Sequence, residues 1–79
     1  MSELERRRWR TTFGGVLRAK RLSAGWTQKE LARDAGLPEM TISHYETGRR
    51  YPSLSNIVAL ADSLRCSVDE LLSRGGEAS

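Results

Sequence analysis

Apolar residues recur along this chain with the 3.6-residue period of an α-helix in five short segments. None of the segments alternates in the two-residue period of a strand. In the first, Phe13, Val16 and Leu17 fall on one face, which predicts a helix from about Thr11 to Ala24. Gly25 follows as a left-handed helix end. The pattern predicts an all-α protein.

Two short helices are expected next, separated by about three residues around Gly36. Thr27 and Glu30 have the spacing of a capping box, so the second helix should begin just after Thr27. Pro38 lacks only an N–H that a first helical turn leaves unpaired, and it begins a third helix that runs to about Thr47. Such a pair predicts a helix-turn-helix, whose second helix projects its N-terminal side chains away from the core.

The last two expected helices are also opened by capping residues. Ser53 precedes a fourth helix, and Ser67 with Glu70 forms another capping box before a fifth. The apolar stripe of the fourth helix is expected to contain Leu54, Ile57, Leu60, Ala61 and Leu64, and that of the fifth Val68, Leu71 and Leu72. We expect residues 1–10 to be a basic N-terminal arm, 11–73 the folded domain, and 74–79 a flexible tail.

Length and composition narrow the function classes. Seventy-nine residues with 38% apolar content suit one domain with one small core. There is no apolar run of about 20 residues and no signal peptide, so we expect a cytoplasmic protein with no membrane partner. A single cysteine, Cys66, and a single histidine, His44, predict neither a disulfide nor a metal site. We expect no cofactor and no enzymatic activity, because His44 has no evident nucleophile with an orienting group.

The net charge of +3 is unevenly distributed. Residues 1–26 carry seven Arg or Lys against two Glu, whereas residues 27–79 carry six against eight acids. This basic first third favours a polyanion partner, which the Arg49-Arg50 pair would also contact. The alternative is an ordinary solvated surface.

The outer face of the third helix is the candidate binding surface. Ile42 and Tyr45 are expected to face inward, which leaves an outer strip of four exposed residues: Glu39, Met40, Ser43 and His44. The major groove of B-DNA is about 12 Å wide and admits one α-helix with such a strip against base edges.

The ordered string of residues 25–32 (GWTQKELA), 35–37 (AGL) and 41–54 (TISHYETGRRYPSL) resembles the Xre/Cro-like, phage-repressor-type helix-turn-helix regulators. The resemblance covers residues 13–72 and implies a compact five-helix lambda-repressor-like DNA-binding domain, with the helix-turn-helix at helices two and three. It implies that the outer strip meets bases and that Arg21 and Glu46 form a structural ion pair. The phosphate-binding residues that it implies are Thr27, Gln28, Lys29, Thr47, Arg49, Arg50 and Tyr51. Pro38 and Glu39 depart from the polar or basic residues of many relatives, so one base-reading residue is acidic.

These observations predict a small transcriptional regulator that binds double-stranded DNA as a homodimer on a two-fold-symmetric operator. The expected dimer seam consists of Leu64, Val68, Leu71 and Leu72, with half-sites about 34 to 36 Å apart. A restriction-modification controller and a prophage switch are both compatible with this prediction. The alternative is an antitoxin or protein-interaction module with the same fold, whose partner is a toxin or a polymerase subunit. Trp9 is expected to cap the first helix, contact a partner subunit, or lie on a disordered arm.

Overall fold

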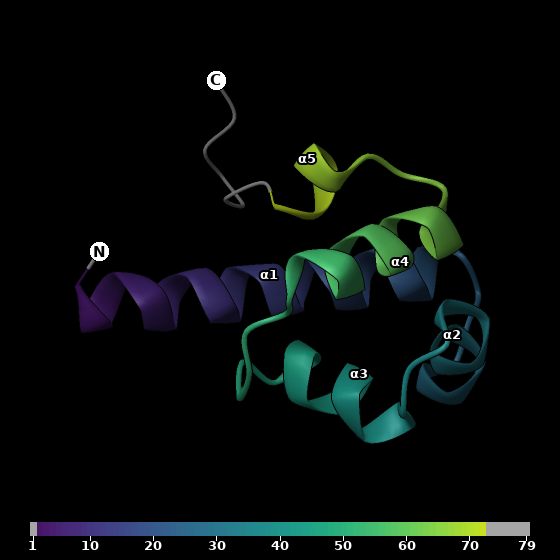
Figure 1. Ribbon diagram of the computed structural model, residues 1–79, viewed down its shortest axis with the longest axis horizontal. Helices are drawn as coiled ribbons and strands as arrows, with labels where there is room; N and C mark the ends of the chain where they lie inside the picture. The colour runs from purple at the N-terminus through teal and green to yellow at the C-terminus, as the bar shows by residue number, and fades with distance from the viewer. Residues whose placement is uncertain (1, 73–79) are drawn as a thin grey trace.

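Five helices and no strand make up residues 2–72, the part of the chain that the computed structural model describes (Figure 1). The helices are α1 (Glu3–Ser23), α2 (Gln28–Ala35), α3 (Glu39–Glu46), α4 (Leu54–Leu64) and α5 (Val68–Leu71). The all-α, five-helix prediction is therefore confirmed. The flexible tail expected at 74–79 lies outside the described residues.

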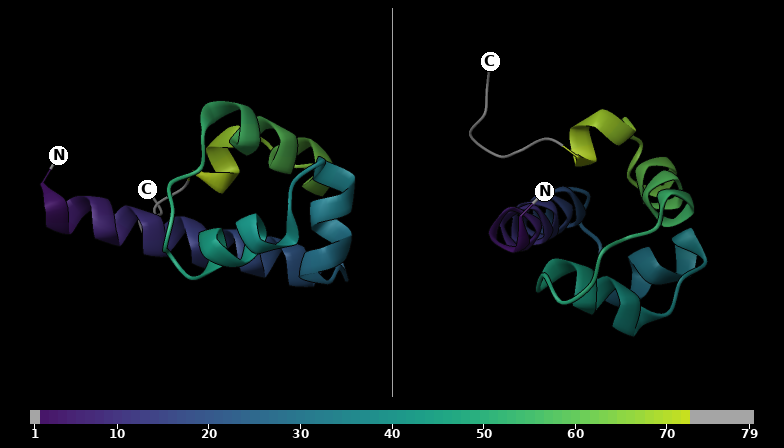
Figure 2. Two further views of the ribbon diagram at one scale, coloured as in Figure 1. Left: turned by 60° about the horizontal axis from the view of Figure 1, so that its bottom comes forward. Right: turned by 60° about the vertical axis from the view of Figure 1, so that its left-hand side comes forward.

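Helix α1 begins at Glu3, so the boundary expected at Thr11 is wrong. The side chain of Ser2 accepts a hydrogen bond from the Glu5 amide at 3.1 Å, and the Glu5 carboxylate accepts one from the Ser2 amide at 2.9 Å. This capping box satisfies two amides that a helix start leaves unpaired. Residues 3–10 are thus helical, and these first turns extend beyond the rest of the molecule (Figures 1 and 2).

The other helix ends follow the local signals in the sequence. Both expected capping boxes are present, with the Thr27 and Ser67 side chains each accepting from the amide three residues on at 3.0 Å. Ser53 caps α4 in the same way at 3.2 Å. Gly36 ends α2 with φ of 73°, a left-handed conformation that glycine adopts without steric cost.

The core lies between α1, the α2–α3 pair and α4, and α5 closes it on one side (Figure 2). Its fully buried side chains come from all five helices: Phe13, Leu17, Leu31, Ile42, Leu60 and Leu71. Leu54 does not belong to it, because 72% of its surface is exposed. A helical side chain covers the turn that precedes its own position, and the first residue of α4 has no preceding helical turn to cover.

Leu71 is completely buried within the protomer, so its predicted place in a dimer seam is wrong. The other three members of that seam, Leu64, Val68 and Leu72, are half-buried and pack against the core. A side chain that its own protomer already encloses has no surface left for a second copy.

Gly14 sets the distance between α1 and α3. A Cβ atom at this position would lie 2.7 Å from the carbonyl oxygen of Glu46 and would also clash with that of Tyr45. The α1 backbone therefore approaches the end of α3 more closely than any other residue would allow. From α4, the Asn56 amide donates to the Tyr45 hydroxyl at 2.8 Å, which holds the same end of α3 from the other side.

Candidate nucleic-acid interface

A tight turn sets the direction of α3. After the left-handed residue Gly36, the Leu37 amide donates to the Ala32 carbonyl at 2.9 Å, and Pro38 starts the next helix with φ of −64°. No side chain caps α3, because its N-cap is proline. The predicted helix-turn-helix is therefore present, with α3 bounded by glycine- and proline-containing connections.

An open groove runs along the outward side of α3. Its lining combines the four residues of the outer strip with three residues that flank them: Gln28, Glu39, Met40, Ser43, His44, Thr47 and Arg49. Met40 is 67% exposed, whereas Ile42 and Tyr45 on the opposite side of the helix are at most 3% exposed. The structure thus separates the outer strip from the core as the helical period predicts.

The outer strip offers several kinds of base contact. The Glu39 carboxylate can accept a hydrogen bond from the amino group of cytosine but is repelled by phosphate. The Met40 side chain offers dispersion contact, for example to a thymine methyl group. Ser43 and His44 are half-buried polar residues that can donate and accept hydrogen bonds. An acceptor, an apolar group and two donor–acceptor groups along one helix face constitute a surface that can discriminate bases.

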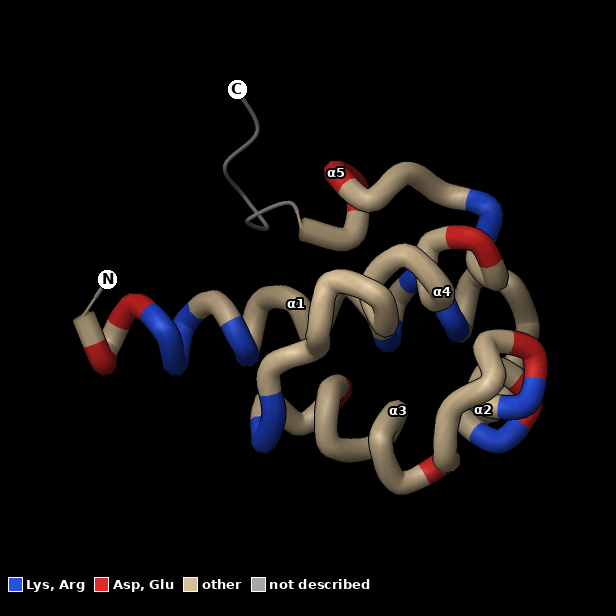
Figure 3. Tube along the Cα trace, viewed as in Figure 1, with Lys and Arg blue, Asp and Glu red and all other residues tan. Residues whose placement is uncertain are grey.

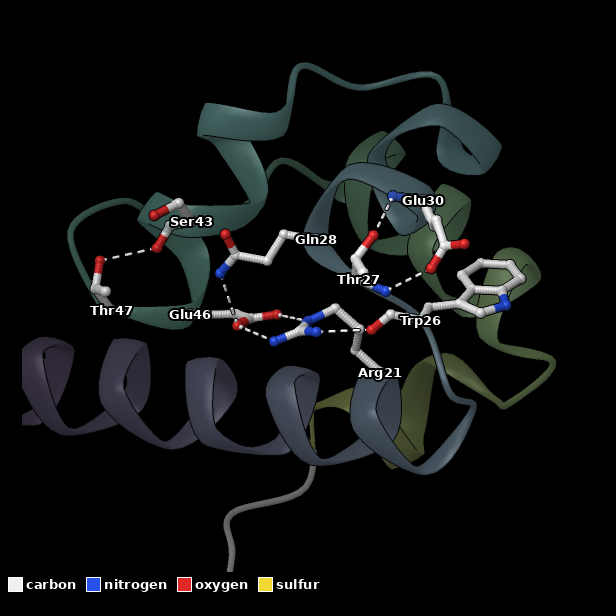
Figure 4. A network of polar contacts seen from close by, with 8 residues as sticks. All are labelled: Arg21, Trp26, Thr27, Gln28, Glu30, Ser43, Glu46 and Thr47. Atoms are coloured by element: carbon white, nitrogen blue, oxygen red, sulfur yellow. Dashed lines mark hydrogen bonds and ion pairs between the residues drawn. The ribbon is translucent and has the colours of Figure 1, made fainter.

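A buried polar network joins α1, the start of α2 and the end of α3 (Figure 4). The Arg21 guanidinium donates to both Glu46 carboxylate oxygens, through Nε at 2.6 Å and Nη2 at 3.1 Å, and its Nη1 donates to the Trp26 carbonyl at 2.7 Å. Only 10% of the Arg21 side chain and 4% of the Glu46 side chain are exposed. The hydrogen bonds to Glu46 raise the pKa of Arg21 above its ordinary value, so the guanidinium stays charged. The ion pair that the sequence resemblance implies is therefore present and buried.

Gln28 connects this network to the groove. Its Nε2 donates to Glu46 Oε1 at 3.0 Å, while the residue also lines the groove beside the outer strip. A side-chain amide has two N–H groups, so Gln28 keeps a second donor. The buried carboxylate of Glu46 therefore orients Gln28 without using all of its hydrogen-bonding capacity.

The remaining predicted phosphate-binding residues differ in whether their hydrogen-bond donors are already used within the protein. Lys29, Arg49 and Arg50 are exposed. The Thr27 hydroxyl accepts a bond from the Glu30 amide, so its own proton is not used by that bond. The Thr47 hydroxyl instead donates to the Ser43 carbonyl at 2.9 Å, and phosphate would have to replace this bond.

Tyr51 belongs to an aromatic stack that sequence reasoning missed. The rings of Phe13, Trp9 and Tyr51 follow one another, with centroid distances of 5.7 Å for Trp9–Phe13 and 5.2 Å for Trp9–Tyr51. The guanidinium of Arg10 lies 4.8 Å from the centroid of the Tyr51 ring. Trp9 is thus a half-buried helical residue, and its spacing of four residues from Phe13 was the available signal.

Residues 17–71 match the model of a protein family described as helix-turn-helix. The chain belongs to this helix-turn-helix family. Over 48 residues it is 38% identical to the cryptic phage CTXphi transcriptional repressor RstR of Vibrio cholerae, covering 61% of this chain and 43% of that protein. Over 58 residues it is 33% identical to the antitoxin HipB of Escherichia coli, covering 73% and 62% of the two chains.

A solved structure of the P22 c2 repressor in complex with a synthetic operator superimposes on this chain with a TM-score of 0.74. The two are 32% identical, and the match covers 78% of this helix-turn-helix chain and 94% of the repressor chain. The present chain spans about half the length of the curated relatives it matches. Within residues 2–72, no helix is long and apolar enough to cross a membrane.

Proposed function

We propose that this chain binds double-stranded DNA in a sequence-specific manner, with α3 in the major groove, and acts as a transcriptional regulator. The observation that carries the proposal is the outer strip on α3: four outward side chains line an open groove, while the opposite side of the helix is held by Gly14, Asn56 and the Arg21–Glu46 pair. A helix fixed in this way presents its side chains to base edges with little conformational freedom left to lose. The similarity of the chain to a phage repressor and to a repressor solved in complex with a synthetic operator supports the same function.

We further propose that the protein acts as a homodimer on an operator with two-fold symmetry. One helix in one groove contacts too few bases to select a site from a genome. The proposed seam contains Leu64, Val68 and Leu72, and half-sites would lie about 34 to 36 Å apart. Such a regulator acts where the chromosome is, so the proposed compartment is the cytoplasm.

Selection of bound sequences from a random duplex pool tests this function. We expect the recovered sequences to share one motif with two-fold symmetry and half-sites one helical turn apart. A pool that stays random after several rounds would contradict sequence-specific binding.

Arg50→Ala tests the role of the α3–α4 connection (residues 47–53) in a salt titration of duplex binding. Because Arg50 is exposed and cationic, its loss should weaken binding to all duplexes alike and flatten the log–log salt dependence by about one per protomer. The slope is measured by titrating duplex binding at salt concentrations from about 50 to about 200 mM, a range over which counterion release changes the affinity strongly. A loss of affinity confined to one sequence would contradict a phosphate contact.

The second candidate function is an antitoxin or adaptor whose partner is a protein, such as a toxin or a polymerase subunit. The identity to the antitoxin HipB is the specific observation that favours it. A module that only binds protein should show no salt-sensitive association with random duplex at low salt, whereas a DNA-binding protein should show it.

A further inference from the structure

The first two turns of α1 carry four arginines within residues 6–10 and extend beyond the globular body (Figure 3). None of these residues lines the groove beside the outer strip. In Figure 3 the basic bands of this segment lie near the basic band of the α3–α4 connection, which carries Arg49 and Arg50. The function proposed above does not use this part of the helix.

The aromatic stack and Arg10 hold the segment to the α3–α4 connection. Trp9 lies between Phe13 of the core and Tyr51 of the connection, and the Arg10 guanidinium covers the Tyr51 ring. Among residues 2–72, Arg10 Nε is the buried side-chain polar atom without a hydrogen-bond partner. The neighbouring ring accounts for this, since the face of an aromatic ring attracts a cation without accepting a conventional hydrogen bond. The segment is thus fixed relative to α3.

Arg7 lies on the side of α1 that faces the connection. It precedes Gly14 by about two helical turns and Thr11 by about one, so the three residues share one face of the helix. Gly14 touches the end of α3. The backbone of Gly48 packs against Thr11, since a Cβ atom at Gly48 would lie 3.4 Å from Thr11 Oγ1. Arg7 therefore lies one turn beyond Thr11, where Gly48 of the connection touches α1.

Arg7 is also available for an external anion. The only ion pair described for it joins Arg7 Nε to the Glu3 carboxylate at 3.9 Å, with 71% and 67% of the two side chains exposed. An exposed pair at this distance is weak, so a phosphate can replace Glu3. Arg8 is exposed as well, but it lies about 120° around the helix from the Gly14 face.

We propose that the first two turns of α1 form a second DNA-contacting element, in which Arg7 binds backbone phosphates beside the groove that α3 enters. This inference rests on the proposed function. The charge of the segment suits a duplex, which presents one phosphate per about 3.4 Å along each strand. Arg7 is about 10 Å along the helix axis from Gly14, the length of roughly three base pairs. The element therefore contacts DNA outside the base-reading segment and carries no sequence preference.

The experiment compares the wild-type protein with Arg7→Gln and Arg8→Gln on two duplexes. Both duplexes contain the motif recovered from the random pool, one trimmed to the motif and one with about eight flanking base pairs on each side, more than the roughly three that the segment spans. On the long duplex, R7Q should flatten the log–log salt dependence by about 0.9 per protomer, so its affinity deficit should shrink by about 3.5-fold per protomer between 50 and 200 mM salt. On the trimmed duplex, R7Q should match the wild type. R8Q, the matched control, should match the wild type on both.

Four other results would overturn the proposal or one part of it. An equal effect of R7Q on both duplexes would overturn the flanking position, and equal effects of R7Q and R8Q would overturn a positioned contact. If the wild type binds neither duplex, the proposed function fails and the inference with it. If it binds both and R7Q has no effect, only the second element fails.

The aromatic stack supplies an independent test, with Trp9 as a positioning residue. In a Trp9→Ala background the further change R7Q should have little effect on the long duplex, whereas in Trp9→Phe it should keep its effect. Circular dichroism of both variants, with thermal unfolding, shows whether the overall helix content and the cooperative transition are retained. An undiminished R7Q effect in W9A would contradict positioning by the stack.

Discussion

Truncating Arg21 should destabilise the protein far more than its single ion pair suggests. Only 4% of the Glu46 side chain is exposed in the native protein, and the variant Arg21→Met leaves its carboxylate with Gln28 as the one remaining side-chain donor. It also removes the donor of the Trp26 carbonyl. Removing one partner of a buried pair costs about 3–5 kcal/mol. Because a chain of this length has an unfolding free energy of roughly 4–12 kcal/mol, R21M should lose a large part of its stability.

The double variant Arg21→Met/Glu46→Leu distinguishes the loss of the ion pair itself from the cost of leaving one buried charge unpaired. It leaves no unpaired carboxylate, and apolar replacement of a whole buried pair is often close to neutral. We therefore expect it to be more stable than R21M. Arg7→Met, which breaks the exposed pair with Glu3, should change the unfolding free energy by less than about 1 kcal/mol.

Urea unfolding followed by circular dichroism gives these free energies by linear extrapolation. Two results would refute the reasoning. One is an R21M loss no larger than that of R7M. The other is a double variant whose loss equals the sum of the losses of R21M and of the single variant Glu46→Leu, since independent sites add and a buried pair does not.

Three further predictions concern other parts of the molecule. Gly14→Ala should lower the melting temperature, because its methyl group meets the Tyr45 carbonyl, while Gly15→Ala, which meets nothing within 4 Å, should not. Glu39→Ala should relax the preference at one base of each half-site and leave or raise affinity for random duplex; an unchanged motif in a repeated selection would remove Glu39 from base reading. The Lys20 ammonium, followed by the Ser67 amide, holds the pKa of Glu70 below its usual value, so this contribution to stability is present above about pH 4.3 and is lost as the pH falls through the folded-state pKa. Lys20→Gln should reduce that loss in acid unfolding, and an acid profile identical to that of the wild type would contradict it.

Local signals predicted most helix boundaries because the groups involved are close in sequence. The Thr27 and Ser67 capping boxes and the left-handed Gly36 all lie where the sequence predicts. The start of α1 was missed because most residues of its first turns are charged, and the Trp9–Phe13 spacing is the one apolar repeat that links them to the core. The Ser2–Glu5 spacing was the signal that could have corrected this.

Contacts between distant residues could not be predicted in the same way. An apolar period does not distinguish a core position from a subunit seam, and Leu71 was therefore misplaced. Nothing near Gly14 in the sequence shows that the carbonyls of α3 lie against it. The link from Glu46 to Gln28 likewise depends on how α2 and α3 cross. The outer strip was predictable because it follows from helix geometry alone.

The alternation of buried and exposed positions along α3 has a consequence for how such proteins diverge. Ile42 and Tyr45 are enclosed, so exchanging them disturbs the whole molecule. Met40 and Glu39 are exposed, and substitutions at such sites usually change stability by no more than about 0.5 kcal/mol. A lineage can therefore acquire a new target site through single codon changes while every intermediate still folds.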